Sequence, residues 1–143
     1  MRVKLINAGP ERTFAVVLDK GDEVLECLLA FAKEHGLSAA EFSGLGAFSD
    51  CVLGFFDWEK KDYKRIPVRE QVEVLALIGN IALKDGQPKL HPHVTVGKAD
   101  GTAHGGHLLE AHVRPVLEVI VTESPAQLRR KTDEETGLAL LRV

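Results

Sequence analysis

The sequence lacks the features that identify several large protein classes. It contains only two cysteines, Cys27 and Cys51, and they form no paired-cysteine motif. Small secreted scaffolds depend on several disulfides, so two scattered thiols indicate a reducing compartment and core positions. No apolar run approaches the roughly 18 residues of a membrane span, and residues 1–7 hold no apolar segment long enough for a secretory signal. We therefore expect a cytoplasmic protein with no membrane partner.

Positive charge is also scarce. The formal net charge is −3 and the pI is about 6.1, whereas domains that bind nucleic acid through their overall charge are usually clearly basic. The most basic stretch, from Lys60 to Arg69, is interrupted by Asp62 and is more typical of a solvated hairpin. DNA binding is therefore weakly supported, although a local basic patch is compatible with the sequence.

Length and composition are those of one ordinary globular domain. The chain has 143 residues, of which 45% are apolar and 27% are charged. No linker, low-complexity tract or obvious internal repeat divides it. We therefore expect a single domain over residues 1–143.

Apolar periodicity predicts one long helix among many strands. Val24, Leu28 and Phe31 recur at helical spacing, Asp22 is a suitable cap, and Gly36 is a typical stop. Strand-like runs cover residues 3–7, 13–18, 39–48, 51–56, 63–69, 72–83, 90–96, 102–109, 116–122 and 138–143, and residues 127–135 suggest a short helical turn. This pattern predicts an α+β fold: a largely antiparallel β-sheet with one main α-helix packed on it.

The most site-like feature is a set of histidines between residues 91 and 107. His91 and His93 lie two apart in a predicted strand, so they share a face, with Cα atoms about 6.6 Å apart. Two imidazoles at that spacing can converge on one ion. A third ligand would come from the following strand, where His104 and His107 are the candidates.

The register of the hairpin decides between these two histidines. A two-residue loop at Asp100-Gly101 would place His107 opposite Val94, on the wrong face. A three-residue loop, residues 99–101, would place Gly101 in the left-handed position and His93 directly opposite His107, with His104 on the other face. We prefer the second register, although a slip of one residue would reverse the assignment.

Three histidines on one face would leave a coordination position free for water or a ligand. Open sites of this kind are reactive or ligand-binding, whereas structural zinc is usually closed by four ligands. We therefore predict that His91, His93 and His107 bind zinc or another divalent transition metal. The alternative is that all three are polar residues on a solvated hairpin.

The remaining candidates carry weaker signals. The small-residue segment Ser43–Ser49 lacks the spacing of a nucleotide-binding loop and suggests tight packing or a subunit contact. The cluster Arg129–Lys131 is followed by acidic residues 133–135 and looks self-neutralising. Glu110, Glu118 and Glu123 lie near the histidine strands in sequence, and one of them could serve as a general base or orient a histidine.

Four segments, taken together, resemble the PPC domain, the plant and prokaryote conserved domain. They are Gly44–Ser49, Val72–Ile81, His91–His107 and Thr132–Leu138, in that order along nearly the whole chain. The resemblance implies a single-domain α+β fold and a homotrimer. Plant members accompany AT-hook motifs in nuclear DNA-binding proteins, but the hook core Arg-Gly-Arg-Pro is absent here. Plant domains also typically lack histidines at positions 91, 93 and 107, which suggests a site particular to the prokaryotic form.

Two functions follow as hypotheses. The first is a homotrimeric ligand-binding or assembly module in which the metal holds a small molecule or the trimer. The second is a zinc-dependent hydrolase or lyase that uses metal-activated water. An open coordination position with a nearby carboxylate would favour the second.

Overall fold

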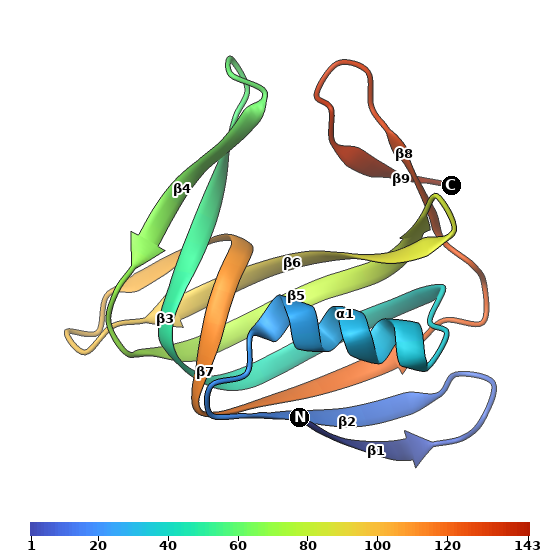
Figure 1. The fold of residues 1–143 in the computed structure, drawn as a ribbon, viewed down its shortest axis with the longest axis horizontal. Helices are drawn as coiled ribbons and strands as arrows, with labels where there is room; N and C mark the ends of the chain where they lie inside the picture. The colour runs from blue at the N-terminus through green and yellow to red at the C-terminus, as the bar shows by residue number, and fades with distance from the viewer.

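Strands account for most of the chain in the computed structural model, which describes residues 1–143 (Figure 1). In chain order they are β1 (Arg2–Asn7), β2 (Thr13–Asp19), β3 (Ala39–Asp57), β4 (Asp62–Val68), β5 (Val72–Lys84), β6 (Gln87–Gly97), β7 (Ala103–Glu123), β8 (Arg129–Thr132) and β9 (Ala139–Arg142). The helix α1 (Val24–Glu34) connects β2 to β3. No helix combines the length and apolar character needed to cross a bilayer.

The residue that caps the helix lies one position later than predicted. Glu23 caps it, because its side chain accepts a hydrogen bond from the backbone N–H of Glu26 at 2.7 Å. The carboxylate of Asp22 instead accepts from the N–H of Asp19. The helix ends at Glu34, His35 is its C-cap, and Gly36 follows with a left-handed φ of 63°.

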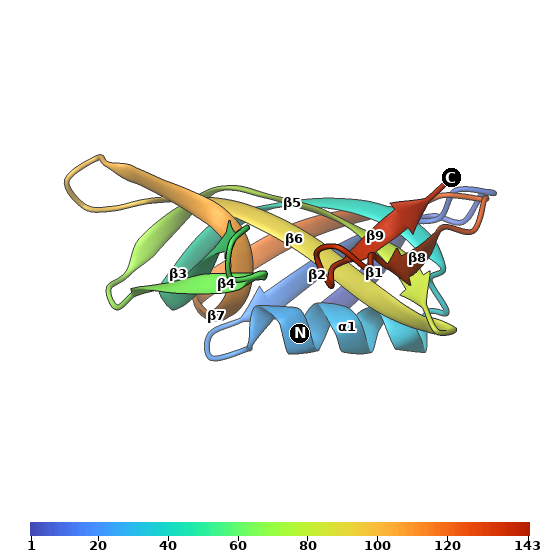
Figure 2. The ribbon, with the colours of Figure 1, turned by 90° about the horizontal axis from the view of Figure 1, so that it is seen from above.

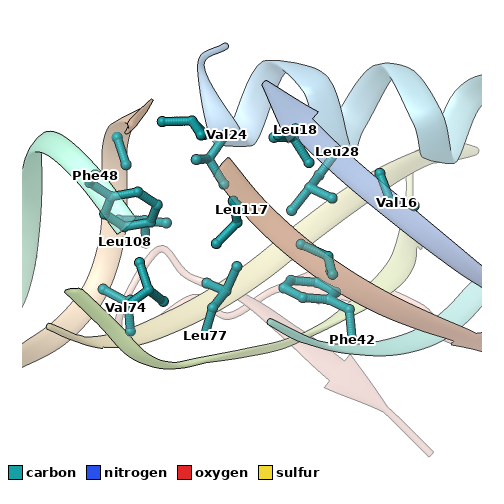
Figure 3. Packing of buried hydrophobic residues seen from close by; sticks show 14 of the residues in the cluster. Val16, Leu18, Val24, Leu28, Phe42, Phe48, Val74, Leu77, Leu108 and Leu117 are labelled. Atoms are coloured by element: carbon teal, nitrogen blue, oxygen red, sulfur yellow. The ribbon is translucent and has the colours of Figure 1, made fainter. Parts of the chain in front are cut away.

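The predicted α+β class, with one main helix packed on a sheet, is wrong. Strands hold 65% of the residues and helix only 8%, and α1 is 11 residues long. Of the 26 residues in the hydrophobic core cluster, only four belong to α1: Val24, Leu28, Phe31 and Ala32. The molecule is mostly β because its strands bury their apolar sides largely against one another, and the short helix adds only one small face (Figure 3).

The pairing of the strands closes the sheet into a ring. β3 pairs with β5, β5 with β6, β6 with β7, and β7 again with β3, all antiparallel. β2 and β1 extend the sheet from β7, and β4 pairs with the far end of β3. Figure 2 shows the strands as a curved layer with α1 running along one side. A closed ring leaves fewer free strand edges than an open sheet.

Two strands are much longer than their sequence patterns predict. The patterns divide β3 and β7 into two strands each, but the two run unbroken for 19 and 21 residues respectively. Three irregularities in their shared ladder, between Gly46 and Leu53, let them curve together. At Gly46 an added Cβ would lie 2.2 Å from the carbonyl oxygen of Val116. The prediction of tight packing in segment 43–49 is therefore confirmed.

The C-terminal segment is a hairpin, so the predicted helical turn at 127–135 is wrong. β8 pairs antiparallel with β9, and Arg130 lies opposite Leu141. Leu83 of β5 bridges to Arg129, which attaches the hairpin to the main sheet. In Figure 1 this β8–β9 hairpin and the β3–β4 hairpin rise on the same side of β6. They bring residues from distant parts of the sequence toward the histidine strand.

Candidate metal centre

The hairpin of β6 and β7 has the register of the three-residue loop. His93 pairs directly with His107, and Val96 pairs with His104. Gly101 has φ of 82°, and its N–H donates to the carbonyl of Lys98 at 2.9 Å, as that loop requires. The β6–β7 ladder ends at His93, so β7 does not pair with Pro92. The nitrogen of Pro92 has no hydrogen to donate to a partner strand.

The three predicted histidines converge. His91, His93 and His107 each offer a ring nitrogen, and these atoms lie within 4.8 Å of one another. The Nε2 atoms of His91 and His93 are 3.2 Å apart. Two ligands at about 2.05 Å from a tetrahedral ion are roughly 3.3 Å apart, so this pair already has the required spacing. The ring nitrogen of His107 lies within 4.8 Å of both.

Burial keeps two of these imidazoles neutral. It lowers the pKa of His107 to about 4, with smaller contributions from His91, His93 and Lys89. Burial also lowers the pKa of His91, and the positive charge of Arg130 adds to that effect. A metal ion binds the unprotonated ring nitrogen, so a neutral imidazole at neutral pH is the form that can coordinate.

One nitrogen in the cluster has no partner. The Nδ1 atom of His107 is buried and forms no hydrogen bond. A buried polar atom without a partner costs free energy, and a bound ion or water would satisfy it. Three imidazole nitrogen donors, with no fourth protein ligand in the cluster, fit a divalent transition metal that keeps one position open.

An aromatic ring from the β3–β4 hairpin covers the third histidine. Tyr63 stacks on His107 with ring centroids 4.8 Å apart and an angle of 29° between the planes. Gly54 and Gly106 make room for this arrangement, because an added Cβ on Gly106 would lie 2.7 Å from the carbonyl oxygen of Gly54. Gly106 is thus explained by a close approach within the chain itself. Sequence reasoning missed Tyr63, since nothing local links it to His107.

Two of the three carboxylates suggested by sequence are engaged elsewhere. Glu110 bonds Arg65 at 3.2 Å and Glu123 bonds Arg12 at 2.7 Å. Glu118 is exposed and forms no hydrogen bond with a histidine. The acidic residue that lines a cavity of about 420 Å³ with His91 and His93 is Glu41 of β3. Its position comes from two successive strand pairings, Glu41 with Asn80 and Asn80 with His91.

Arg130 also departs from its predicted environment. The sequence predicts that the acidic residues after segment 129–131 neutralise it, but Arg130 is only 8% exposed. It donates to the side-chain oxygen of Asn80 and to the carbonyl of Ala139. Asp133 instead accepts hydrogen bonds from Thr136. The buried side chain of Arg130 therefore contacts Asn80, the cross-strand partner of His91.

The other three histidines have separate roles. His35 packs against the rings of Phe14 and Phe31 at the end of α1. His112 hydrogen-bonds Asp50 through Nδ1 at 2.8 Å. His104 is exposed and lies outside the cluster.

Comparison with known proteins found a matching family model and several similar solved structures. A family model described as the Plants and Prokaryotes Conserved (PCC) domain matches residues 6–125. A candidate DNA-binding protein from Bacteroides thetaiotaomicron is 31% identical, with TM-score 0.88 over 98% of this chain and 96% of that one. A plant- and prokaryote-conserved protein from Pyrococcus horikoshii is 35% identical, with TM-score 0.86 over 99% and 95%. A metal-containing protein from Archaeoglobus fulgidus is 36% identical, with TM-score 0.85 over 99% and 97%.

The curated relatives are longer proteins. The bifunctional protein GlmU of a Synechococcus strain is 28% identical over 145 aligned residues, which cover 99% of this chain and 22% of that protein. The chain thus spans about a fifth of the length of the curated relatives it matches.

Proposed function

The chain belongs to the Plants and Prokaryotes Conserved domain family, and we propose that it is a ligand-binding or assembly module that holds a divalent metal, with zinc the best fit, through His91, His93 and His107. The observation that carries the proposal is the convergence of three ring nitrogens within 4.8 Å. The unpartnered Nδ1 of His107 supports it further. So does the similar protein from Archaeoglobus fulgidus, which is described as metal-containing.

The direct test is metal loading of a His107→Ala variant. The protein is purified without chelator, incubated with zinc and desalted, and its zinc is measured by elemental analysis. We expect about one zinc per chain in the natural sequence and none in the variant, because two histidines alone hold the ion weakly. His104→Ala is the matched control, since this exposed histidine of the same strand lies outside the cluster. A His107→Ala protein that keeps its zinc would contradict the proposed ligand set.

We also propose that the protein is a homotrimer and that the metal site lies near a subunit boundary. Three apolar side chains, Leu45, Ile78 and Ile120, are 61%, 58% and 44% exposed. Ile78 and Ile120 both pair with Ser43, and Ile78 also pairs with His93, so these side chains share one face of the sheet with the histidines. A contiguous apolar patch of this kind is typical of a protein interface.

A zinc-dependent hydrolase or lyase is the second candidate, and Glu41 favours it. Zinc would lower the pKa of a bound water toward about 7, and Glu41 lines the cavity beside His91 and His93, where a general base would be needed. If the protein is such an enzyme, Glu41→Gln should retain zinc and lose turnover of a small ester or keto acid substrate. Equal turnover by both proteins would exclude Glu41 as the base.

We propose a single domain over residues 1–143 and a cytoplasmic location, which the two free thiols, Cys27 and Cys51, support. DNA is the weaker partner proposal. Two similar proteins carry a DNA-binding description, but the net charge here is −3, and Arg65 of the basic hairpin is paired with Glu110.

A further inference from the structure

Arg130 carries a positive charge that no carboxylate of the chain neutralises. Its side chain is almost fully buried, and its only hydrogen bonds go to the neutral oxygens of Asn80 and Ala139. The Nε atom is buried without any partner. A guanidinium has five N–H donors, so most of its hydrogen-bonding capacity is unused. A buried cation without a counter-ion is costly, which indicates that an anion from outside completes the site.

This arginine lines a cavity of about 190 Å³ together with two of the metal-site histidines. Its other lining residues are His91, His107, Tyr63, Lys89, Leu90 and residues 137–140 of the C-terminal hairpin. Not one lining residue is acidic. Arg130 is close enough to His91 to lower the pKa of that imidazole, after the larger effect of burial.

The charge balance of the cavity is strongly positive. Arg130 and Lys89 each contribute one positive charge, and histidine ligands are neutral, so a divalent ion would keep its full charge. A volume of about 190 Å³ corresponds to roughly six water molecules at about 30 Å³ each, which limits the ligand to a few non-hydrogen atoms. The planar fork of an arginine matches the two oxygens of a carboxylate.

We propose that this cavity binds a small carboxylate anion, with the carboxylate paired to Arg130 and the other end of the molecule directed toward His91 and His107. The inference rests on the proposed metal function, because the ion would hold that other end. A phosphate usually draws on several cations or on backbone N–H groups at a helix N-terminus. This cavity offers a single planar guanidinium and no helix N-terminus, and that fork matches the two oxygens of a carboxylate.

The test compares two probes of nearly equal shape. Glycolate carries the carboxylate and a hydroxyl, whereas glycolamide replaces the carboxylate with a neutral amide. Zinc content is measured first, and binding to the zinc-loaded protein is then followed by calorimetry. We expect glycolate to bind at least about tenfold more tightly than glycolamide, the usual effect of a charge-assisted hydrogen bond.

Arg130→Gln should remove most of that preference and leave the zinc content unchanged. Arg129→Gln is the matched control, because Arg129 is the exposed neighbour on the same strand and its side chain hydrogen-bonds only Gln127. A zinc-loaded Arg130→Gln protein that still prefers glycolate to the same extent would overturn the carboxylate proposal alone. Absence of zinc from the natural protein would instead overturn the metal function on which it rests.

A measurement on the unmodified protein covers the case in which Arg130→Gln does not fold. The Nε–H signal of Arg130 in a nitrogen-15 NMR spectrum should shift on addition of glycolate and stay in place with glycolamide. No shift at a glycolate concentration that saturates the calorimetric binding would overturn the proposal. A response to inorganic phosphate without any response to glycolate would overturn the carboxylate class.

Discussion

At the scale of the residue, neighbours decide which histidines are free to bind an ion. His35 is packed against two phenylalanine rings and His112 is hydrogen-bonded to Asp50. His107 keeps a buried nitrogen without a partner, and burial lowers its pKa to about 4. The side chain is the same in each case, but only the last environment leaves a neutral donor available.

The pair of His112 and Asp50 should make stability depend on pH. The hydrogen bond to Asp50 raises the pKa of His112, and the same bond lowers the pKa of Asp50. The contribution from His112 is fully present below its unfolded pKa of about 6.5 and is lost as pH rises through its higher folded pKa. The contribution from Asp50 is lost only as pH falls through its depressed folded pKa.

Urea unfolding of Asp50→Asn checks this prediction. Asp50→Asn should lower the free energy of unfolding at pH 6 by under about 1 kcal/mol, because the pair is partly exposed, and by less at pH 9. Asp100→Asn is the control, since Asp100 bonds Thr102 and no histidine. An equal loss at pH 6 and pH 9 would show that the ion pair is not the source of the effect.

At the scale of the element, two hairpins complete a site that β6 and β7 begin. The β3–β4 hairpin places Tyr63 on His107, and the β8–β9 hairpin places Arg130 beside Asn80, the cross-strand partner of His91. Both hairpins rise on the same side of β6 (Figure 1). The two side chains come from segments that precede and follow the histidine strands by many residues.

Removal of the ring of Tyr63 should weaken metal binding without unfolding the protein. The stacked ring holds the imidazole of His107 in place, and residues that orient a metal ligand typically contribute about 10-fold or more in affinity. We expect Tyr63→Leu to reduce zinc affinity by about that factor, measured by competition with a coloured chelator. Tyr63→Phe keeps the ring and should behave like the natural protein. A Tyr63→Leu protein with unchanged affinity would indicate that the rest of the sheet positions His107 alone.

At the scale of the whole molecule, one face of the sheet combines the histidines with an exposed apolar patch. Leu45, Ile78 and Ile120 make up the patch, and Ile78 lies directly across from His93. Apolar side chains with this much exposure in an ordered sheet are more typical of an assembly surface than of a monomer surface. The trimer proposal therefore has a specific surface that experiment can disrupt.

A charge placed in the patch should break the trimer. Ile120→Lys puts an unpaired cation where the proposal buries an apolar side chain, so light scattering should report a particle of about one chain's mass. Ile6→Lys is the control, because Ile6 is 55% exposed but lies at the end of β1, at the outer edge of the sheet. If the natural protein is itself a monomer, or if Ile120→Lys remains a trimer, this surface is not the interface.

Local rules of the chain are enough to predict part of this protein. The spacing of His91 and His93 places both on one face of a strand, and Gly101 at the third loop position sets the register that pairs His93 with His107. Each of these facts depends on residues close together in sequence. The amino-acid sequence by itself therefore determines which histidines come together.

Tertiary structure alone decides how the strands close and what surrounds the histidines. The α+β prediction fails because a pattern of apolar residues does not reveal that β3 and β7 each continue through bulges and pair with several strands at once. Tyr63, Glu41 and Arg130 reach the site only through such distant pairings. The charges near Arg130 in the sequence suggest a neutral, solvated segment, but β8 turns that side chain inward, where local charge patterns carry no information about its partners.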